Sequence, residues 1–400
     1  MKRRLISGPA KFRRVLAGLL AGLISVLAAA AASTAGSAPS QAATPGASAD
    51  GGTTVIGGRQ LSGRGVIVNY PAHGAPRLPA VPAYSYVIAD AGTGKVLAAK
   101  DPHGWFDPAS TLKVLTAITL MPVLNPDATV VASRMAADVE PSKVGLVAGQ
   151  RYTVADLFQA LLLISANDAA ISLVQATGSF AKGVAMMNTE ARHLRADDTV
   201  ARQPNGLDAP GQHVSAYDEA LFARQALKMP MFMQDDEMLT ARFPLRPHHA
   251  VTLYNQDSML TKYPGDLGGK IGWTTAAGAT YVGFARRGGV TLIVTLLHCP
   301  PLTETTYAAR LLNWGFAVDG KIRPVGRLVR PEPAGTARRR AKNEVDTRPL
   351  PAGRSFSSLP ADRTVPVAAG AAALVLAAAV GGLALAVSRR RQRAGNRPFP

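Results

Sequence analysis

Residues 107–120 read Asp-Pro-Ala-Ser-Thr-Leu-Lys-Val-Leu-Thr-Ala-Ile-Thr-Leu, and the rest of the chain is organised around them. Pro108 suits a first helical turn and the apolar residues recur at helical spacing, so we expect a helix over 109–121. Ser110 then lies near a helix N-terminus, which favours developing negative charge, and Lys113 follows one turn later on the same face. This is the Ser-x-x-Lys form of an activated nucleophile. A capping serine and an ordinary helix lysine is the simpler interpretation, so partner motifs must decide.

The positive charge of the chain lies at its ends. The 400 residues carry a formal charge of +18. Residues 15–320 hold 22 basic and 22 acidic side chains, so the excess belongs to 1–14, 321–363 and 389–400. A neutral globular part has no net field to attract a polyanion, and we therefore expect no nucleic-acid partner.

The composition also argues against metal and cofactor chemistry. Cys299 is the single cysteine, which excludes an internal disulfide or a cysteine cluster, and its apolar surroundings predict a buried, inert thiol. His248 and His249 are adjacent and would point apart, and the seven histidines show no ligand spacing such as His-Glu-x-x-His. We expect no metal and no cofactor.

The N-terminus has the pattern of a secretory signal. A basic segment, 1–14, precedes an unbroken apolar run, 15–32, and small residues follow. We interpret 1–43 as a signal peptide, with an uncleaved anchor as the alternative. The Ala/Ser/Gly/Thr-rich stretch 44–65 is typical of a flexible spacer.

Residues 66–320 are expected to form one catalytic domain. Strands are predicted at 84–89, 95–100, 267–274, 281–285 and 290–297, and helices at 153–164, 215–229 and 305–316. Because a block of helices separates early from late strands, we expect a mixed α/β (α+β) fold. Its antiparallel sheet would be flanked by helices and interrupted by an inserted helical subdomain.

The C-terminal part predicts a tether. Residues 321–364 are rich in proline and arginine and are expected to be a basic linker. Residues 365–387 are apolar and uncharged, and as a helix would span about 34 Å, against about 30 Å of hydrocarbon. The basic tail 388–400 then places this end in the cytoplasm and the catalytic domain outside the membrane.

Two further motifs follow the Ser-x-x-Lys pair. Ser165-Ala-Asn167 ends one predicted helix and begins another, and Lys270-Ile271-Gly272 lies on a predicted strand. With passages such as Pro-Asn-Gly-Leu-Asp at 204–208, the ordered set over residues 80–318 resembles the low-molecular-weight D-alanyl-D-alanine carboxypeptidases. These are serine DD-peptidases with the penicillin-binding, β-lactamase-like fold.

The resemblance implies an acyl-serine mechanism. Ser110 would be the nucleophile, Lys113 the neutral base, and Ser165 the proton relay to the leaving D-alanine amine. The backbone N–H groups of Ser110 and Trp273 would form the oxyanion hole. Burial and the second cation Lys270 would lower the pKa of Lys113.

The same resemblance implies the substrate contacts. Asn167 would hydrogen-bond the substrate backbone and brace the base. Lys270, together with Gly272, Trp273 and Thr274 on its strand, would bind the peptide and its terminal carboxylate. From the residues alone, a cap pair at 165–167 and an exposed strand lysine remain simpler alternatives.

Ile271 departs from the family pattern, which has Thr or Ser there. The lost hydroxyl leaves open a catalytically weakened, wall-binding homologue, although Thr274 or Thr275 could compensate. A class A β-lactamase is disfavoured because no Glu-x-x-Leu-Asn follows Asn167 before Lys270. The expected partners are the peptidoglycan pentapeptide as substrate, β-lactams as covalent inhibitors, and the cytoplasmic membrane through the C-terminal helix.

Overall fold

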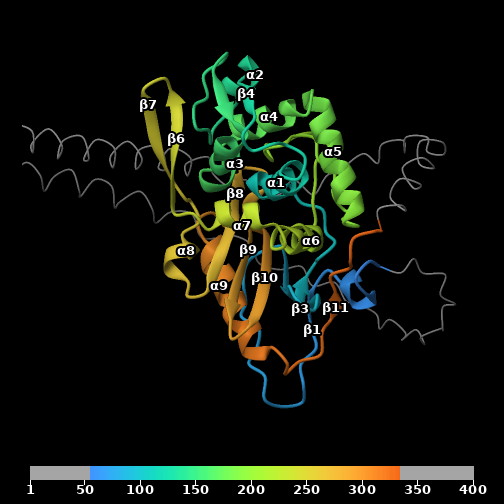
Figure 1. The fold of residues 1–400 in the computed structure, drawn as a ribbon. Helices are drawn as coiled ribbons and strands as arrows, with labels where there is room; N and C mark the ends of the chain where they lie inside the picture. Colours follow the sequence, from blue (N-terminus) through green and yellow to red (C-terminus); the bar gives the residue numbers. More distant parts are fainter. Residues whose placement is uncertain (1–54, 334–400) are drawn as a thin grey trace, which may run out of the picture. The chain divides into compact units, whose positions relative to one another are not determined.

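A twisted antiparallel sheet forms the centre of the computed structural model, which describes residues 55–333 (Figure 1). Six strands follow the order β1–β3–β2–β10–β9–β8, and a seventh, β11, also pairs with β3. Their bounds are Val66–Val68 (β1), Ser85–Asp90 (β2), Lys95–Lys100 (β3), Asp266–Thr274 (β8), Gly278–Arg287 (β9), Val290–Cys299 (β10) and Gly326–Arg327 (β11). The strand β8 is an edge of this sheet, which leaves one side of its backbone free for a ligand.

The five predicted strands are confirmed, and a turn of two glycines joins two of them, β9 and β10. Arg287 ends β9 and Val290 begins β10, so only Gly288 and Gly289 form the connection. Both glycines have positive φ, at 53° and 84°. A two-residue turn with positive φ at both positions matches the twist of paired strands, which is why this signal could be recognised in the sequence.

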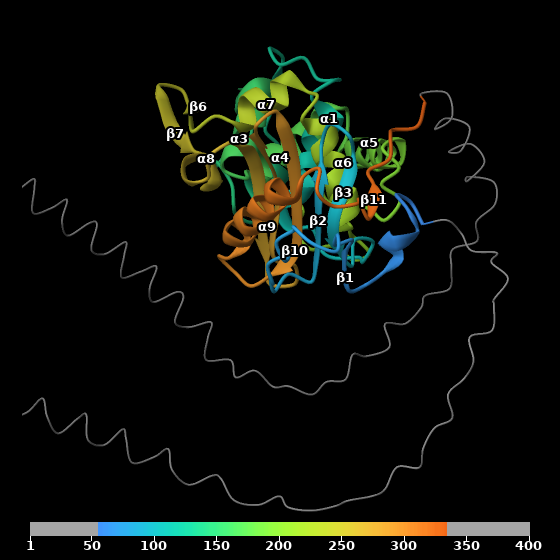
Figure 2. The ribbon, with the colours of Figure 1, turned by 90° about the horizontal axis from the view of Figure 1, so that it is seen from below.

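Most helices lie in one block between β3 and β8, as predicted, and the mixed α/β fold class is confirmed. Two small two-stranded sheets accompany them, β4–β5 and the hairpin β6–β7, and the hairpin projects away from the body (Figures 1 and 2). The helices of this block are η2 (Ala109–Leu112), α1 (Lys113–Leu120), α2 (Arg134–Ala137), α3 (Val154–Leu163), α4 (Asn167–Ala176), α5 (Phe180–His193), α6 (Ala216–Ala226), α7 (Pro230–Asp236) and α8 (Met259–Lys262). The strands of these two small sheets are Thr129–Val131 (β4), Arg151–Thr153 (β5), Thr240–Arg246 (β6) and His249–Tyr254 (β7).

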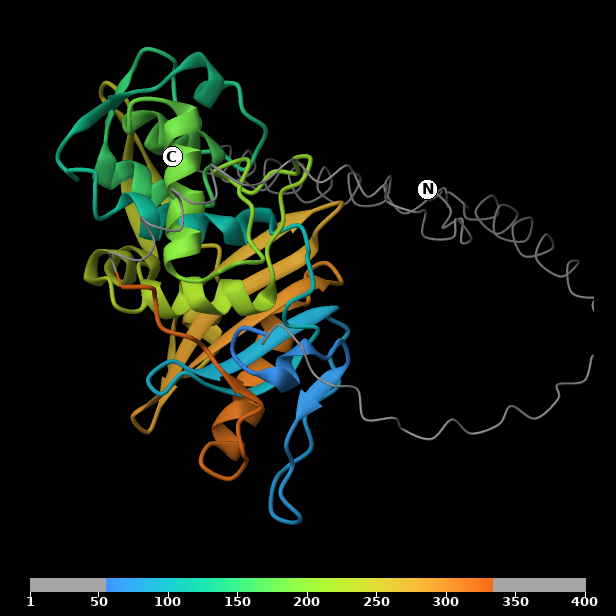
Figure 3. The ribbon, with the colours of Figure 1, turned by 90° about the vertical axis from the view of Figure 1, so that its right-hand side faces the viewer.

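The sheet separates two hydrophobic cores, because successive strand residues point to opposite faces. In β2, Val87 and Ala89 belong to the core shared with α1, α3, α4 and α6, whereas Tyr86 and Ile88 belong to the core beneath α9 (Glu304–Val318). Figure 3 shows the helical block on one side of the sheet and α9 on the other. The edge strand β8 therefore lies where the two layers meet.

Ordered elements extend beyond both ends of the expected catalytic domain, 66–320. The helix η1 (Arg59–Ser62) lies within the expected spacer, and its Leu61 is fully buried. The strand β11 lies within the expected linker, where Arg327 N donates to Gly57 O at 2.8 Å. Together with β1, these short segments cover the outer edge of β3. Their few apolar residues give almost no sequence signal, since backbone pairing supplies much of what holds them.

Several predicted segments fall outside the described residues: the signal peptide 1–43, the spacer up to 54, the linker from 334 to 364, the membrane helix 365–387 and the tail 388–400. Among residues 55–333, no helix combines the length and apolar character needed to cross a membrane.

Candidate active site

Ser110 is the second residue of a short 3₁₀ turn, η2, that leads directly into a buried helix. The predicted helix is present, but η2 replaces its first turn and Lys113 is the first residue of α1. All eight residues of α1 are buried. Ala109 has a φ of 47°, unusual for a residue with a side chain, and the hydroxyls of Thr111 and Thr280 each donate to Pro108 O, at 2.7 and 2.9 Å. Ser110 is therefore presented on a fixed support.

Three oxygens surround the side-chain amine of Lys113, which is itself fully buried. The Nζ atom lies 2.8 Å from Ser110 Oγ, 2.7 Å from Asn167 Oδ1 and 2.7 Å from Asn205 O. Burial and the charge of Lys270 lower the pKa of Lys113 well below its usual value, against an opposing effect of Asp168. The Ser-x-x-Lys pair is thus in direct contact, and its amine is biased toward the neutral form.

Asn167 has a fixed orientation. Its Nδ2 donates to Glu140 O at 2.8 Å, so Oδ1 must be the atom that faces Lys113. The neighbouring Asp168 is fully buried and accepts hydrogen bonds from the backbone N–H groups of three consecutive residues, 144–146, at 2.8 to 3.1 Å. The start of α4 consequently holds both the amide and the loop that binds it.

Ser165 occupies the turn between α3 and α4. It has a φ of 61°, and it is 4% exposed. Its Oγ has no hydrogen-bond partner among the described residues. The predicted end of one helix and start of another at 165–167 is confirmed, and this strained turn holds a free hydroxyl at the cleft wall.

Lys270 is not an exposed strand lysine. It is 1% exposed, and its Nζ donates to Ile271 O at 3.0 Å. Burial lowers the pKa of Lys270 to about 8, although Asp236 and Asp257 favour its charged form. Next to it on β8, Gly272 faces Ser110, because a Cβ at residue 272 would lie 2.6 Å from Ser110 N. The three motifs therefore meet in space.

A group of buried carboxyls lies behind Lys270, and no sequence pattern indicates it. Tyr281 donates its hydroxyl to Asp257 Oδ2 at 3.0 Å, while neither oxygen of Asp236 has a hydrogen-bond partner among the described residues. Burial, and then Asp257, raises the pKa of Asp236 well above its usual value, and burial raises that of Asp266 to about 8. These acids come from α7, from the loop before α8 and from the start of β8, so only folding brings them together.

The loop 204–208 contributes a further contact that the sequence analysis named only as a family passage. Asn205 supplies the carbonyl bonded to Lys113. Gly206 has a φ of 81°, and a Cβ there would lie 1.7 Å from Ala109 O. Glycine is required at this position because two backbones meet there.

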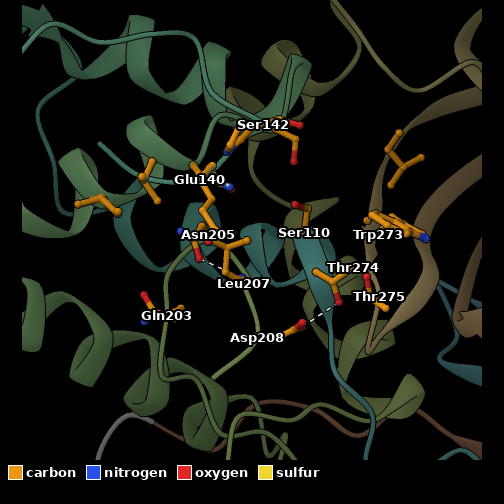
Figure 4. A pocket seen from close by; sticks show the side chains of 18 of the residues that line it. Ser110, Glu140, Ser142, Gln203, Asn205, Leu207, Asp208, Trp273, Thr274 and Thr275 are labelled. Atoms are coloured by element: carbon orange, nitrogen blue, oxygen red, sulfur yellow. Dashed lines mark hydrogen bonds between the residues drawn. The ribbon is translucent and has the colours of Figure 1, made fainter. Parts of the chain in front are cut away.

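The outer part of β8 lines the opposite wall. Trp273 is 58% exposed, and Thr274 Oγ1 donates to Asp208 Oδ1 at 2.8 Å (Figure 4). Ile271 instead packs partly against the core beneath α9. Thr274 could replace the hydroxyl missing at residue 271 only by giving up this bond to Asp208. The Thr275 hydroxyl makes no hydrogen bond within residues 55–333.

These residues open into one cleft of about 1050 Å³. Ser110, Ser165, Asn167 and Gly272 all line it. Figure 4 shows Ser110 at its centre, between the loop of Asn205 and Leu207 and the strand that carries Trp273. A peptide lying in this cleft along β8 would bring a backbone carbonyl against the serine hydroxyl.

The described residues give no support to metal chemistry. No group of three or more His, Cys, Asp or Glu side chains within 55–333 is placed to hold a metal ion. Cys299 is buried, and burial raises its thiol pKa to about 12.

Comparisons with known proteins agree with this geometry. The family model described as D-alanyl-D-alanine carboxypeptidase matches residues 72–300. The D-alanyl-D-alanine carboxypeptidase DacB2 of Mycobacterium tuberculosis is 39% identical over 255 residues, covering 62% of this chain and 87% of that protein. A solved D-alanyl-D-alanine carboxypeptidase of the same organism is 38% identical, with a TM-score of 0.61 over 64% of this chain and 99% of that one. A variant of the Streptomyces K15 DD-transpeptidase is 28% identical, with a TM-score of 0.56 over 60% and 99% of the two chains.

Proposed function

The chain belongs to the D-alanyl-D-alanine carboxypeptidase family of serine hydrolases, and from this premise we propose that it removes the terminal D-alanine of peptidoglycan stem pentapeptides through an acyl-Ser110 intermediate. Carboxypeptidase activity on D-alanyl-D-alanine is the family's activity, and the peptide cleft around Ser110 suits it.

One observation carries the mechanism: the arrangement of acceptors around Lys113. Two of its three partners, Asn167 Oδ1 and Asn205 O, can only accept hydrogen bonds. A neutral amine has two N–H donors and one lone pair. If the two N–H groups satisfy these oxygens, the lone pair is directed at the Ser110 hydroxyl, 2.8 Å away. The amine is then oriented as a base toward the nucleophile.

The reaction follows from that arrangement. Ser110 Oγ attacks the carbonyl carbon of the penultimate D-alanine while its proton passes to Lys113 Nζ. The tetrahedral intermediate collapses, the peptide C–N bond breaks, and the leaving amine takes a proton, with Ser165 as the relay. A water molecule then attacks the Ser110 ester with Lys113 again as base, which releases the shortened peptide.

Charge and backbone geometry assist the attack. The N–H groups of Ser110 and Trp273 are the proposed oxyanion donors, each worth roughly 3–4 kcal/mol. Gly272 leaves the approach to Ser110 N open. We assign Lys270 to the terminal carboxylate, Asn167 to the peptide backbone, and Trp273 and Thr274 to the walls that position the substrate.

Intact-mass measurement with benzylpenicillin tests the proposal. We expect the wild-type ectodomain to gain the mass of one penicilloyl group, which is lost only slowly, and Ser110→Ala to gain none. Ser165→Ala should be acylated slowly, because its nucleophile and base remain. Unchanged labelling of the Ser110→Ala variant would falsify the nucleophile assignment.

A catalytically weakened, wall-binding relative is the second candidate, and Ile271 is the observation that favours it. Ile271 has no hydroxyl to offer the substrate carboxylate, and the hydroxyl of Thr274 is already bonded to Asp208. D-alanine release from diacetyl-Lys-D-Ala-D-Ala separates the two candidates. Release by the Ile271→Thr variant together with none by wild type supports the weakened relative, and release by wild type supports the enzyme.

The proposal includes an extracytoplasmic location with a membrane anchor at 365–387, supported by the sequence pattern alone. Export would place the cleft beside peptidoglycan. Deletion of residues 365–400 should move the protein from the membrane fraction to the soluble fraction without changing its acylation by benzylpenicillin. A truncated protein that stays in the membrane fraction would contradict the anchor.

A further inference from the structure

The charged side chains that line the cleft around Ser110 share one sign. Among the described residues that line it, every charged side chain is acidic: Asp138, Glu140, Asp208 and Glu304. The two lysines of the site are buried beneath its wall. A peptide that ends in a carboxylate therefore meets a surface of its own sign.

Glu304 differs from the other three acids in its surroundings. Asp138, Glu140 and Asp208 are exposed, whereas Glu304 is partly buried, and its Oε2 is buried with no hydrogen-bond partner among the described residues. Glu304 is the first residue of α9. An unpaired carboxylate oxygen at a cleft wall is costly, and a cationic or hydrogen-bond-donating ligand would relieve that cost.

The register of the sheet places Glu304 on the side of residue 271. Trp273 pairs with Ala279, and Ala279 pairs with Cys299, five residues before α9 begins. Ile271 and Trp273 alternate with Lys270 and Gly272, which face Ser110 and Lys113, so they point to the α9 side of β8. Ile271, Ala279, Leu302 and Glu304 all line the same cleft. This end of the cleft thus offers apolar contacts and one carboxylate, but no hydroxyl at residue 271.

We propose that Glu304 determines which leaving residue the enzyme releases, favouring one that carries an ammonium group over a neutral residue of the same length. This inference rests on the proposed function, which directs the leaving residue toward residue 271. The bond cleaved and the acyl-Ser110 intermediate are unchanged. Apolar Ile271 and Leu302 would accommodate the methylene chain of such a residue, and its ammonium would lie beside the Glu304 carboxylate at the cleft wall.

Release of D-alanine continues under this proposal, at a lower rate. The terminal carboxylate is still served by Lys270, while Glu304 opposes it. A leaving residue with its own cation offsets that repulsion, and the advantage should decline as salt screens the pair. Specificity here comes from a repulsive element as much as from an attractive one.

Three peptides test the assignment: diacetyl-Lys-D-Ala followed by D-alanine, D-norleucine or D-lysine. We expect the wild-type kcat/KM for the D-lysine peptide to exceed that for the D-norleucine peptide by about three- to tenfold at low salt. In Glu304→Gln the ratio should fall to about one, and release of D-alanine should rise. Asp138→Asn is the matched control, an equal charge change elsewhere in the cleft, and should keep the wild-type ratio.

Three results would overturn the inference: a wild-type ratio near one, a ratio unaffected by Glu304→Gln, or a ratio equally reduced by Asp138→Asn. Peptides with a free or an acetylated lysine on the acyl side check where Glu304 lies along the substrate. If Glu304→Gln changes only the preference between these two peptides, Glu304 lies beside the acyl part and not beside the leaving residue. Benzylpenicillin labelling separates the two proposals. An enzyme that is acylated but shows no preference refutes the inference alone, whereas one that is neither acylated nor active refutes both.

Discussion

The site contains two buried lysines, Lys113 at the start of α1 and Lys270 on β8, and their surroundings differ. The amine of Lys113 faces a hydroxyl, an amide oxygen and a backbone carbonyl, all uncharged. Lys270 has Asp236 and Asp257 behind it, and both favour its charged form. Burial lowers the pKa of both lysines. The next largest influence on Lys270 is that of the neighbouring carboxylates, whereas on Lys113 it is the positive charge of Lys270.

The difference shows how one fold obtains a base and a cation from the same side-chain type. A buried amine among neutral acceptors loses its proton readily and can accept another from a serine. A buried amine with carboxylates behind it remains charged at neutral pH and can bind an anion. The positive charge of Lys270 also assists the base, because together with burial it lowers the pKa of Lys113.

Removing the base should have the largest effect. Lys113→Met keeps most of the length of the side chain but has no basic nitrogen to take the Ser110 proton, so we expect acylation by benzylpenicillin to slow about 10³-fold. Stopped-flow or mass-resolved acylation rates measure this. A thermal melt similar to that of wild type shows that the fold is kept, and a loss of less than tenfold in that background would mean that another group serves as base.

Making the surroundings of Lys113 resemble those of Lys270 should have the next largest effect. Asn167→Asp places a carboxylate where Oδ1 contacts the amine, which should raise the pKa of Lys113. Acylation at pH 7 should fall about ten- to a hundredfold and recover as pH rises. Asn167→Ala removes the same contact without adding charge, so its acid limb should not move upward. If both variants show the same pH profile, the charge of the neighbour does not matter.

Weakening the support of Lys270 should have a smaller effect. The pKa of Lys270 is about 8, so kcat/KM for a peptide with a free carboxylate should fall as pH rises past about 8. Asp236→Asn removes a group that favours the charged amine, so the fall should move to lower pH and the rate at pH 7 should drop about two- to fivefold. Asp138→Asn, which changes an exposed cleft acid, should leave the limb in place. If the fall in kcat/KM occurs at the same pH in Asp236→Asn as in wild type, Asp236 does not influence the charge of Lys270.

The contrast between the lysines also marks the limit of sequence reasoning. Local patterns were sufficient for the strands of the hairpin β9–β10 and for the helix boundary at 165–167, because turn residues and periodicity are properties of neighbours in the chain. The three motifs were recognised as an ordered set. That Lys113 contacts Asn205, and that Ala109 takes a positive φ against Gly206, required the fold.

The acids behind Lys270 could not be predicted for the same reason. Asp236 ends a short helix, Asp257 lies in a loop and Asp266 begins a strand, positions where an exposed carboxylate is the ordinary expectation. Their burial arises only when α7 and the segment before α8 pack beside β8. The short segments η1 and β11 were missed because neither contains enough apolar residues to form a pattern: Leu61 is the buried residue of η1, and β11 is held by its pairing with β3.

Glu219 shows what burial does to an acid that has no lysine beside it. It is 1% exposed, and burial raises its pKa to about 8, with the Thr111 hydroxyl as the only opposing contact. Thr111 lies between Glu219 Oε1 and Pro108 O, each 2.7 Å from its hydroxyl. A protonated Glu219 can donate to Thr111 while Thr111 donates to Pro108. The neutral acid therefore completes a hydrogen-bond chain that ends two residues before Ser110.

The pH dependence of stability tests this with the smallest expected effect on catalysis. A folded pKa above the unfolded value means that the folded state holds the proton longer, so this stabilisation is complete below about pH 4.5 and is lost as pH rises toward 8. Glu219→Gln resembles the protonated acid, so its free energy of unfolding should decline less between pH 5 and 8, by up to about 1.4 kcal/mol per pH unit relative to wild type. Denaturant titrations at several pH values measure the slope, and acylation at pH 7 should change less than about threefold. If wild type and variant lose stability in parallel, Glu219 is already ionised in the folded protein, and burial without a lysine does not keep it neutral.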